Sequence, residues 1–379
     1  MLVQDKKSEE DAVVGPASKL ERGWGRLRPH LEDLPLRMSG ADPDGAFHLQ
    51  WLPDRLAPSI RRLDPDVVHL HWVCNGFLQV ETLASIQRPI VWTLHDMWPM
   101  TGGCHYSGSC QRYQTRCGAC PKLDSQSESD LSRLTWLRKQ RAWHDLDLTV
   151  VTPSRWLAKC ARSSSLLGSF PVKVIMNGQN LNVFKPIDRT AARHIFNLPT
   201  DCPLILFGAV NATQDTRKGF DLLLESLTAL QDHSLDPSPE LVVFGNTASS
   251  SMPPTRFNTH YLGRFADEEA LAALYSAVDV FVAPSREDNL PMSVQEALAC
   301  GTPVTAFDVG GMPDLIQHRA NGYLATPFDI EDLANGIQWT IADEDRRRDL
   351  SRAARETART TFSTEAKSDE YARLYRTVC

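Results

Sequence analysis

Eight short apolar runs between residues 66 and 311 constrain the fold of this chain more than any other feature of its sequence. Several of them end in Gly, Ser, Asn or Asp directly before a stretch with helical spacing. This pattern is typical of parallel strands joined by helices, with the loops at the carboxyl ends of the strands. We predict strands over 66–73, 90–96, 148–154, 172–178, 204–210, 240–246, 278–285 and 302–311.

Apolar residues spaced three and four apart predict helices over 219–231, 267–277 and 330–341, and a charged helical stretch ends the chain. The first 50 residues have no clear period, and we expect loop with short helices there. A polar crossing near residue 178 separates two sets of strands. We therefore predict an α/β protein with two Rossmann-like domains, 1–178 and 179–379, the last helix packing back on the first domain.

Composition excludes several classes of protein. The chain has 379 residues, 42% hydrophobic and 23% charged, with a formal net charge of −7, so nucleic acid is not an expected partner. No apolar run approaches the length of a membrane span, and the start lacks the core of a signal peptide. Nine cysteines, an odd number, fit a reducing compartment. We expect a soluble, cytoplasmic protein.

Four of the nine cysteines fall within seventeen residues with the spacing C-x5-C-x6-C-x2-C. The C-x2-C end is the usual turn of tetrahedral zinc sites, and four thiolates would close the site, so a metal there would be structural. Free buried thiols or paired thiols are the alternatives. The cysteines are Cys104, Cys110, Cys117 and Cys120.

Two loops of the second half have the residues of an anion site. Arg217 and Lys218 stand directly before Gly219 and a predicted helix, whose free N–H groups would point at the same ligand. Gly310 and Gly311 precede another helix and would present backbone N–H groups to a phosphate. The alternatives are two solvated cations and a plain strand-to-helix turn.

Asp288 and Glu296 lie eight positions apart in the segment "EDNLPMSVQEALACGTP". An ionised carboxylate can accept hydrogen bonds from a pair of sugar or ribose hydroxyls. However, Ser293 and Glu296 also spell S-x-x-E, the sequence of a helix capping box. A capping role for Glu296 leaves Asp288 unexplained.

The run "PSREDNLPMSVQEALACGTPVTAFDVGGMPDLI", with "RKGFDLLL" before it, resembles the GT-B glycosyltransferases of family 4. These retaining enzymes use nucleotide sugars and consist of two facing Rossmann-like domains. The resemblance implies that Asp288 binds the transferred sugar, Glu296 the ribose and Lys218 the diphosphate. The donor-binding residues it implies are Arg217, Lys218, Gly219, Asp288, Asn289, Leu290, Glu296, Gly310 and Gly311, and the catalytic ones are His95, Lys218 and Asp288.

In the first half, "HLHWV" and "WTLHDMWPMTGGCHY" resemble an exopolysaccharide-type subgroup of the family. His95 ends a predicted strand, where a family member would have a histidine that bonds the donor sugar. The alternative is a histidine fixed by its neighbour Asp96 for structural reasons. His69 and His71 share a strand face, and we interpret them as cleft or core residues, not metal ligands.

Two departures from the family pattern stand out. Ala209 and Val210 occupy the place where many members have an arginine, so Arg217 would supply that charge. Family members usually begin with a strand and a glycine-rich loop, whereas this chain opens at "MLVQDKKSEED", which indicates a truncated start or the loss of part of the active site. A non-catalytic scaffold homologue and a phosphorylase are therefore the rivals of an active transferase.

The activity implied by the resemblance is transfer of a sugar from a UDP- or GDP-linked donor to a sugar or lipid-linked acceptor, without a cofactor. Contact with a membrane would come from the segment 131–150, which mixes arginines and a lysine with Trp136 and Trp143. A surface helix with its tryptophans in the core is the preferred interpretation of that segment.

Overall fold

Parallel strands build two separate sheets, one in each of two compact units. The first unit comprises residues 1–153, 157–174 and 374–379, and the second comprises residues 154–156 and 175–373. The structure is a computed structural model that describes the chain except residues 8, 17, 41–46, 209–214, 231–235 and 246–256.

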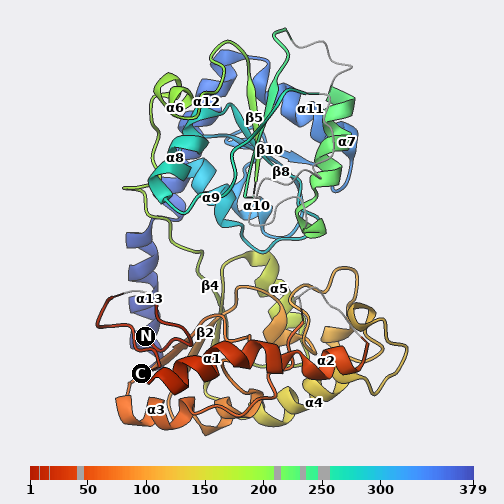
Figure 1. The fold of residues 1–379 in the computed structure, drawn as a ribbon, viewed down its shortest axis with the longest axis vertical. Helices are drawn as coiled ribbons and strands as arrows, with labels where there is room; N and C mark the ends of the chain where they lie inside the picture. Colours follow the sequence, from red (N-terminus) through yellow and green to blue (C-terminus); the bar gives the residue numbers. More distant parts are fainter. Residues whose placement is uncertain (8, 17, 41–46, 209–214, 231–235, 246–256) are drawn as a thin grey trace. The chain divides into compact units, whose positions relative to one another are not determined.

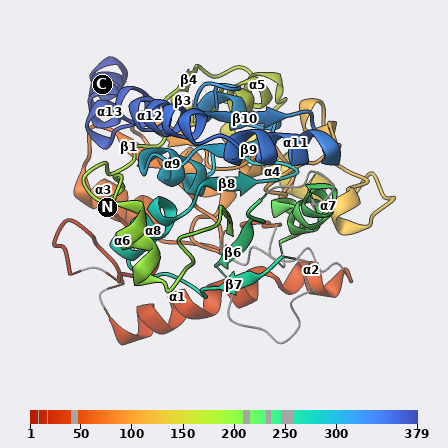
Figure 2. The ribbon, with the colours of Figure 1, turned by 90° about the horizontal axis from the view of Figure 1, so that it is seen from above.

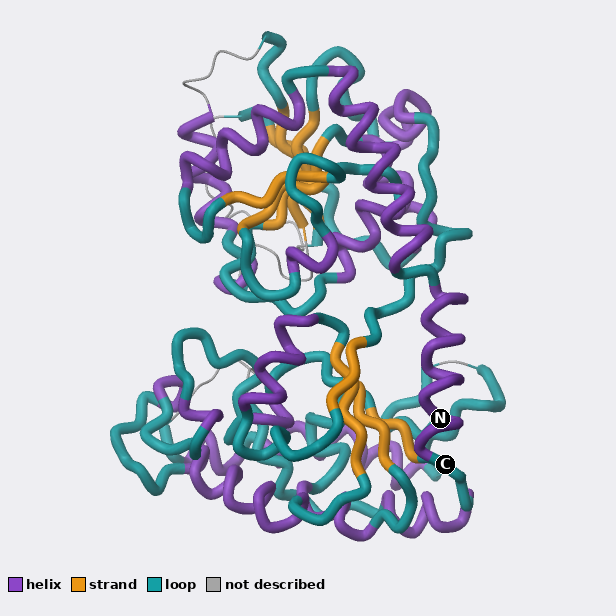
Figure 3. The backbone as a smooth tube through the Cα atoms, turned by 180° about the vertical axis from the view of Figure 1, so that it is seen from behind, coloured by secondary structure: helices purple, strands orange, loops and turns teal. Residues whose placement is uncertain are grey.

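The sheet of the first unit has the order β1-β2-β3-β4, and all three pairings are parallel. The backbone trace shows these four strands side by side (Figure 3). The strands are β1 (Val68–Leu70), β2 (Ile90–Thr93), β3 (Leu148–Thr152) and β4 (Val172–Val174). The α-helices that accompany them are α1 (Lys19–Glu32), α2 (Leu34–Met38), α3 (Leu56–Leu63), α4 (Leu131–Trp143) and α5 (Arg155–Ser163).

The sheet of the second unit has the order β10-β9-β8-β5-β6-β7, again with parallel pairings throughout. Its strands are β5 (Leu204–Gly208), β6 (Glu240–Phe244), β7 (Thr259–Tyr261), β8 (Val280–Ala283), β9 (Val304–Phe307) and β10 (Gly322–Ala325). The chain leaves β5 towards β6 and later returns to β8 on its other side. The order of the strands therefore reverses between β5 and β8.

Helices cover both faces of this second sheet, α7 and α11 on one side and α6, α8 and α9 on the other (Figures 1 and 2). Alternate residues of β5 explain the two layers, because Ile205 and Phe207 pack with α7 and α11 whereas Leu204 and Leu206 pack with α8 and α9. The helices are α6 (Arg189–Ile195), α7 (Phe220–Leu230), α8 (Glu268–Ala277), α9 (Met292–Ala299), α10 (Met312–Leu315) and α11 (Ile330–Ile341).

The chain ends in two helices, α12 (Glu344–Thr361) and α13 (Thr364–Val378). Residues 374–379, which include the end of α13, belong to the first unit. There the Tyr375 hydroxyl lies 2.6 Å from Nδ1 of His69 in β1. The chain therefore passes from the first unit to the second after residue 174 and returns to the first after residue 373.

The eight strands and three helices predicted from the sequence are confirmed, although each strand is shorter than its apolar run. Residues 209, 210 and 246 at the ends of two runs lie outside the described part of the chain. Two strands, β7 and β10, were not predicted. The expectation of only short helices in the first 50 residues was wrong, because α1 is fourteen residues long and begins with a capping box between Ser18 and Glu21.

Candidate active site

The reversal between β5 and β8 is the place where open α/β sheets bind ligands. Gly208 ends β5, and Lys218 follows it in a 3₁₀ turn, η5 (Thr216–Lys218). Ser285 to Asp288 follow the end of β8. The strand order therefore brings the loops of the two predicted motifs together, although seventy residues separate them.

Asp288 pairs with both cations of the first loop. Its Oδ2 atom lies 2.7 Å from Lys218 Nζ and 3.1 Å from an Arg217 guanidinium nitrogen. The side chains of Asp288, Lys218 and Arg217 are 7%, 17% and 28% exposed. The interpretation of two solvated cations was therefore wrong, because both are partly buried and ion-paired.

The glycine loop is shaped by contact with the backbone beside Asp288. A Cβ atom on Gly310 would lie 1.9 Å from the Asp288 carbonyl oxygen, and one on Gly311 would lie 1.7 Å from the Asn289 carbonyl oxygen. Gly310 also has a φ of +56°, which favours glycine. The Gly311 N–H donates to the Asp288 carbonyl at 3.0 Å, so its predicted availability to a phosphate was wrong.

Three further residues predicted to bind the donor support these loops. A Cβ atom on Gly219 would lie 2.0 Å from the Pro284 carbonyl oxygen, which fixes the approach of the two loops. Asn289 is 3% and Leu290 5% exposed, and the Ser154 hydroxyl donates to Asn289 Oδ1 at 2.7 Å. The side chains of these two residues face the protein interior.

Glu296 bonds to a tyrosine and does not cap a helix. Helix α9 begins at Met292 after Pro291, without a side-chain cap, so Ser293 already lies in its first turn. The capping-box interpretation was therefore wrong. The hydroxyl of Tyr275, from α8, donates to Glu296 Oε2 at 2.9 Å, and burial raises the pKa of Glu296.

In the first unit, His71 and His95 follow the carboxyl ends of β1 and β2. Nδ1 of His71 lies 3.0 Å from Nε2 of His95, and the rings stack with centroids 5.3 Å apart. Burial, followed by the charge of His71, lowers the pKa of His95 to about 4. His69, within β1, has its Nε2 atom 2.8 Å from the Thr93 hydroxyl.

Asp96 has a histidine partner that the sequence interpretation missed. Its carboxylate lies 2.6 Å from Nδ1 of His105 and accepts the Trp98 N–H at 2.8 Å. The structure pairs His95 with His71 instead, contrary to the proposed fixing of His95 by Asp96. His105 could have been noticed in the sequence, because it lies in "GGCHY", the end of the motif that resembles the subgroup.

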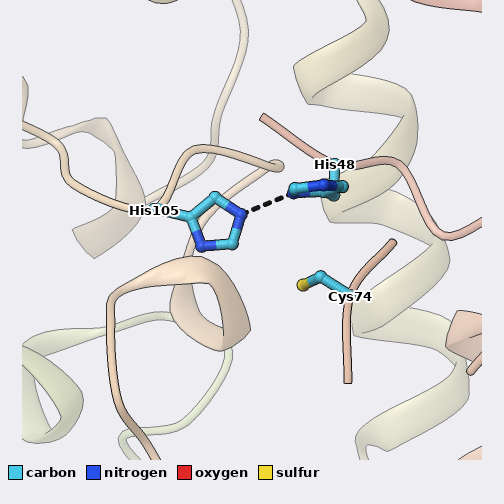
Figure 4. A group of neighbouring side chains, drawn as sticks. All are labelled: His48, Cys74 and His105. Carbon is cyan, nitrogen blue, oxygen red and sulfur yellow. Dashed lines mark hydrogen bonds between the residues drawn. The ribbon is translucent and has the colours of Figure 1, made fainter. Parts of the chain in front are cut away.

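His105 belongs to a buried group with His48 and Cys74, whose side chains point towards one another (Figure 4). Nδ1 of His48 lies 2.6 Å from Nε2 of His105, and Nε2 of His48 lies 2.7 Å from Asn75 Oδ1. The half-exposed Trp72 lies against this group, with its ring centroid 5.9 Å from that of His48. Within the described residues, this is the one group of three or more potential metal ligands within 4.8 Å.

Two family models together match most of the chain. The model for "Glycosyltransferase Family 4" matches residues 15–183, and that for "Glycosyl transferases group 1" matches residues 188–357. A D-inositol 3-phosphate glycosyltransferase of Saccharomonospora viridis is 30% identical over 82% of this chain and 70% of its own length. The chain belongs to the family 4 glycosyltransferases.

Two other relatives of this glycosyltransferase carry two different names. A second D-inositol 3-phosphate glycosyltransferase, from Mycolicibacterium smegmatis, is 33% identical over 77% of this chain, which spans 63% of that relative's length. A putative colanic acid biosynthesis glycosyl transferase of Escherichia coli is 24% identical over 83% of this chain and 77% of its own length. The relatives are thus named for two different molecules, D-inositol 3-phosphate and colanic acid.

Solved structures support the GT-B fold of the enzyme. Sucrose-phosphate synthase from Thermosynechococcus elongatus has a TM-score of 0.65 and 24% identity, covering 85% of this chain and 76% of that one. The Anabaena protein HepE, solved in complex with UDP, has a TM-score of 0.60 and 18% identity, covering 85% and 82%. Within the described residues of the glycosyltransferase, no helix combines the length and apolar character that crossing a bilayer requires.

Helix α4 of the glycosyltransferase packs its tryptophans inward. Trp136 is 5% and Trp143 1% exposed, so the core interpretation is confirmed and these rings cannot rest on a membrane. Lys139 on the same helix is fully buried, donates to the Trp98 and Thr101 carbonyls, and lies 3.4 Å from the Trp98 ring centroid. Burial lowers the pKa of Lys139 to about 7.

The four clustered cysteines line one small cavity of about 20 Å³. All nine cysteines are free thiols, so the alternative of paired thiols is contradicted. Burial raises the pKa of Cys104 to about 12 and that of Cys117 to about 11. The loops around this cavity therefore hold neutral thiols as long as nothing binds them.

Proposed function

We propose that the enzyme moves a sugar from a nucleoside diphosphate sugar to an acceptor hydroxyl with retention of configuration. The observation that carries the proposal is the convergence of Lys218, Arg217 and Asp288 at the strand-order reversal of the second unit. Lys218 and Arg217 bind the diphosphate. Its negative charge takes over part of the attraction that the two cations otherwise have to Asp288. Asp288 accepts from hydroxyls of the transferred sugar, and Glu296 from the ribose.

The chemistry at this site is electrostatic. The bond between the anomeric carbon and the diphosphate oxygen breaks, and the acceptor hydroxyl attacks from the same face. Its proton passes to the leaving diphosphate, so no side chain acts as the nucleophile. Lys218 and Arg217 stabilise the charge that grows on the leaving oxygen, which is the usual work of preorganised cations in a partly buried site.

The acceptor side belongs to the first unit in this proposal. His71 and His95 stand at the carboxyl ends of two neighbouring parallel strands, and the low pKa of His95 keeps it neutral near pH 7. A neutral imidazole donates or accepts a hydrogen bond to a sugar hydroxyl without adding charge. Trp72, 46% exposed, offers an aromatic face on which a sugar or lipid-linked sugar can pack.

Nine free thiols favour a cytoplasmic location for this reaction. An acceptor carried on a lipid would bring the enzyme to the inner face of the membrane. The names of the relatives point to more than one acceptor, so the donor and the acceptor are matters for experiment.

Thermal denaturation with UDP, GDP and their sugar conjugates tests the proposal. A ligand at a hundred times its Kd stabilises the folded chain by about 2.7 kcal/mol, which a melting experiment resolves. We expect one nucleotide family to stabilise the enzyme, and NMR of the product to show the anomeric configuration of the donor. Inverted product contradicts the retaining mechanism, and no stabilisation by any nucleotide favours the scaffold interpretation.

A further inference from the structure

The segment between Thr101 and Asp130 is long and irregular. Its only helical pieces are two 3₁₀ turns, η3 (Arg112–Gln114) and η4 (Pro121–Leu123), and the described residues contain no β-strand there. A small apolar cluster packs against it, formed by Leu36, Phe47, Leu49, Cys104 and Cys120. Irregular segments of this length are uncommon in compact domains unless they have a function or a crosslink.

The four cysteines of this segment surround a single cavity. Its volume of about 20 Å³ is large enough for one ion, since about 10–15 Å³ is enough for a water molecule. Cys104, Cys117 and Cys120 are buried, and Cys110 is partly exposed. All four cysteines therefore border the same cavity.

A backbone N–H group is aimed at one of these sulfurs. The Gly102 N–H donates to Cys117 Sγ at 3.1 Å. The Leu123 N–H, in the turn η4, donates to the Cys120 carbonyl at 3.0 Å and so closes the turn that follows Cys120. Donors directed at sulfur favour the thiolate over the thiol, and the thiolate is the form that binds metal. The Gly102 N–H therefore offsets part of the burial that raises the pKa of Cys117.

Lys139 provides the matching positive charge. Its ammonium is fully buried, and within the described residues no carboxylate forms an ion pair with it. The same ammonium interacts electrostatically with Cys74, Cys117, Cys104 and Asp96. Zinc held by four thiolates carries a net charge of −2, so it would compensate this buried cation.

The group of His48, Cys74 and His105 is the competing metal site. With zinc, the Cys74 thiolate and the Asp96 carboxylate bonded to His105, this group would be neutral. It would therefore leave the charge of Lys139 without compensation. Its two histidines are already bonded to each other, and Asp96 holds His105 in place. Electrostatics therefore favour the four cysteines, although their sulfurs lie farther apart than the three ligand atoms in Figure 4.

We propose that Cys104, Cys110, Cys117 and Cys120 bind one zinc ion as four thiolates. Binding releases four protons and draws the sulfurs in to Zn–S distances of about 2.3 Å. The site has no open position, so zinc orders the segment and takes no part in sugar transfer. This proposal is independent of the donor-site assignment, which concerns the other unit.

Elemental analysis of the full chain expressed with zinc tests the proposal. We expect one zinc per chain, none in the Cys117→Ser and Cys120→Ser variants, and a lower melting temperature in both. The matched control is Cys74→Ser, which removes a buried thiol of the competing group and should keep the zinc. Zinc lost with Cys74→Ser and kept with Cys117→Ser, or a chain without stoichiometric zinc, would overturn the proposal.

A measurement on the wild-type chain covers the case in which the variants do not fold. Titration with a mercurial reagent in the presence of a zinc-sensitive dye follows thiol reaction and metal release together. We expect zinc to leave in step with the last four thiols to react. A cobalt-substituted chain should show the intense visible absorption of tetrahedral tetrathiolate cobalt. Weak octahedral absorption would contradict the four-thiolate site.

Discussion

Replacement of Lys218 by alanine is the most direct test of the donor site. Lys218 Nζ lies 2.7 Å from Asp288, and its side chain is 17% exposed. We expect the variant to fold, because Asp288 keeps its contact with Arg217 at 3.1 Å. The loss of a partly exposed ion pair should cost about 1 kcal/mol or less in the free energy of unfolding.

The expected effect on catalysis is far larger. A unit charge about 4 Å from the growing negative charge contributes on the order of 4 kcal/mol at an effective dielectric constant of 20. Removal of one preorganised donor in other enzymes costs about 2.7–4 kcal/mol, so we expect kcat to fall by about 10²–10³. Lys218→Arg keeps the charge and should recover part of the loss.

Initial rates with saturating donor provide the assay, and Lys367→Ala provides the matched control. Lys367 also lies in the second unit, is 13% exposed and bonds a carboxylate, that of Glu370, at 2.7 Å. We expect the control to keep wild-type kcat. Wild-type turnover in a folded Lys218→Ala variant would refute the assignment, as would an equal loss in the control.

Four other outcomes follow from the structure. Asp288→Asn should bind UDP or GDP up to about tenfold more tightly, since the cations lose their competitor, yet transfer sugar more slowly; weaker binding by calorimetry would contradict this. Glu296→Gln should lower the affinity for a ribonucleotide but not for the matching deoxyribonucleotide, whereas Tyr275→Phe should change both affinities little. Asp279→Ala removes the partner of the buried Arg193 and of the mostly buried Arg347 and should cost about 3–5 kcal/mol in urea unfolding. Burial lowers the pKa of His48 to about 4, so this residue binds more protons in the unfolded chain between pH 6.5 and 4; its share of the loss of stability on acidification should be about 1.4 kcal/mol per pH unit, and His48→Gln should remove that share.

The sequence predicted most of the fold because strands buried on both faces are continuous apolar runs. The strand β5, "LILFG", is buried at all five positions and is therefore visible without its neighbours. The strand β7, "THY", has no buried residue and pairs on one side only, so its sequence has no such run. Helix α1 has a capping box, but its many arginines and exposed apolar residues hide the period.

The sequence predicted those parts of the candidate site whose charged residues stand together in one short motif. It did not predict hydrogen bonds between residues of different elements. Arg217, Lys218 and Asp288 were visible as charges beside predicted strand ends, and the strand order explains why they meet. The use of the Gly311 N–H was not visible, because its acceptor is a backbone carbonyl of another loop, that of Asp288, and no sequence motif marks such an acceptor. The partners of Glu296 and Asp96 likewise come from other elements.

If Lys218 and Arg217 bind the diphosphate as proposed, their pairing with Asp288 explains how one site can bind a doubly charged group and still release it. Without donor, the carboxylate holds Lys218 and Arg217 in position and reduces the cost of leaving two cations partly buried. When the diphosphate arrives, it meets cations that are already ordered, but it must share them with Asp288, which limits the affinity. As the sugar leaves, negative charge on the diphosphate grows whereas that on Asp288 does not. The attraction of the two cations therefore strengthens towards the transition state, the condition under which binding energy accelerates a reaction.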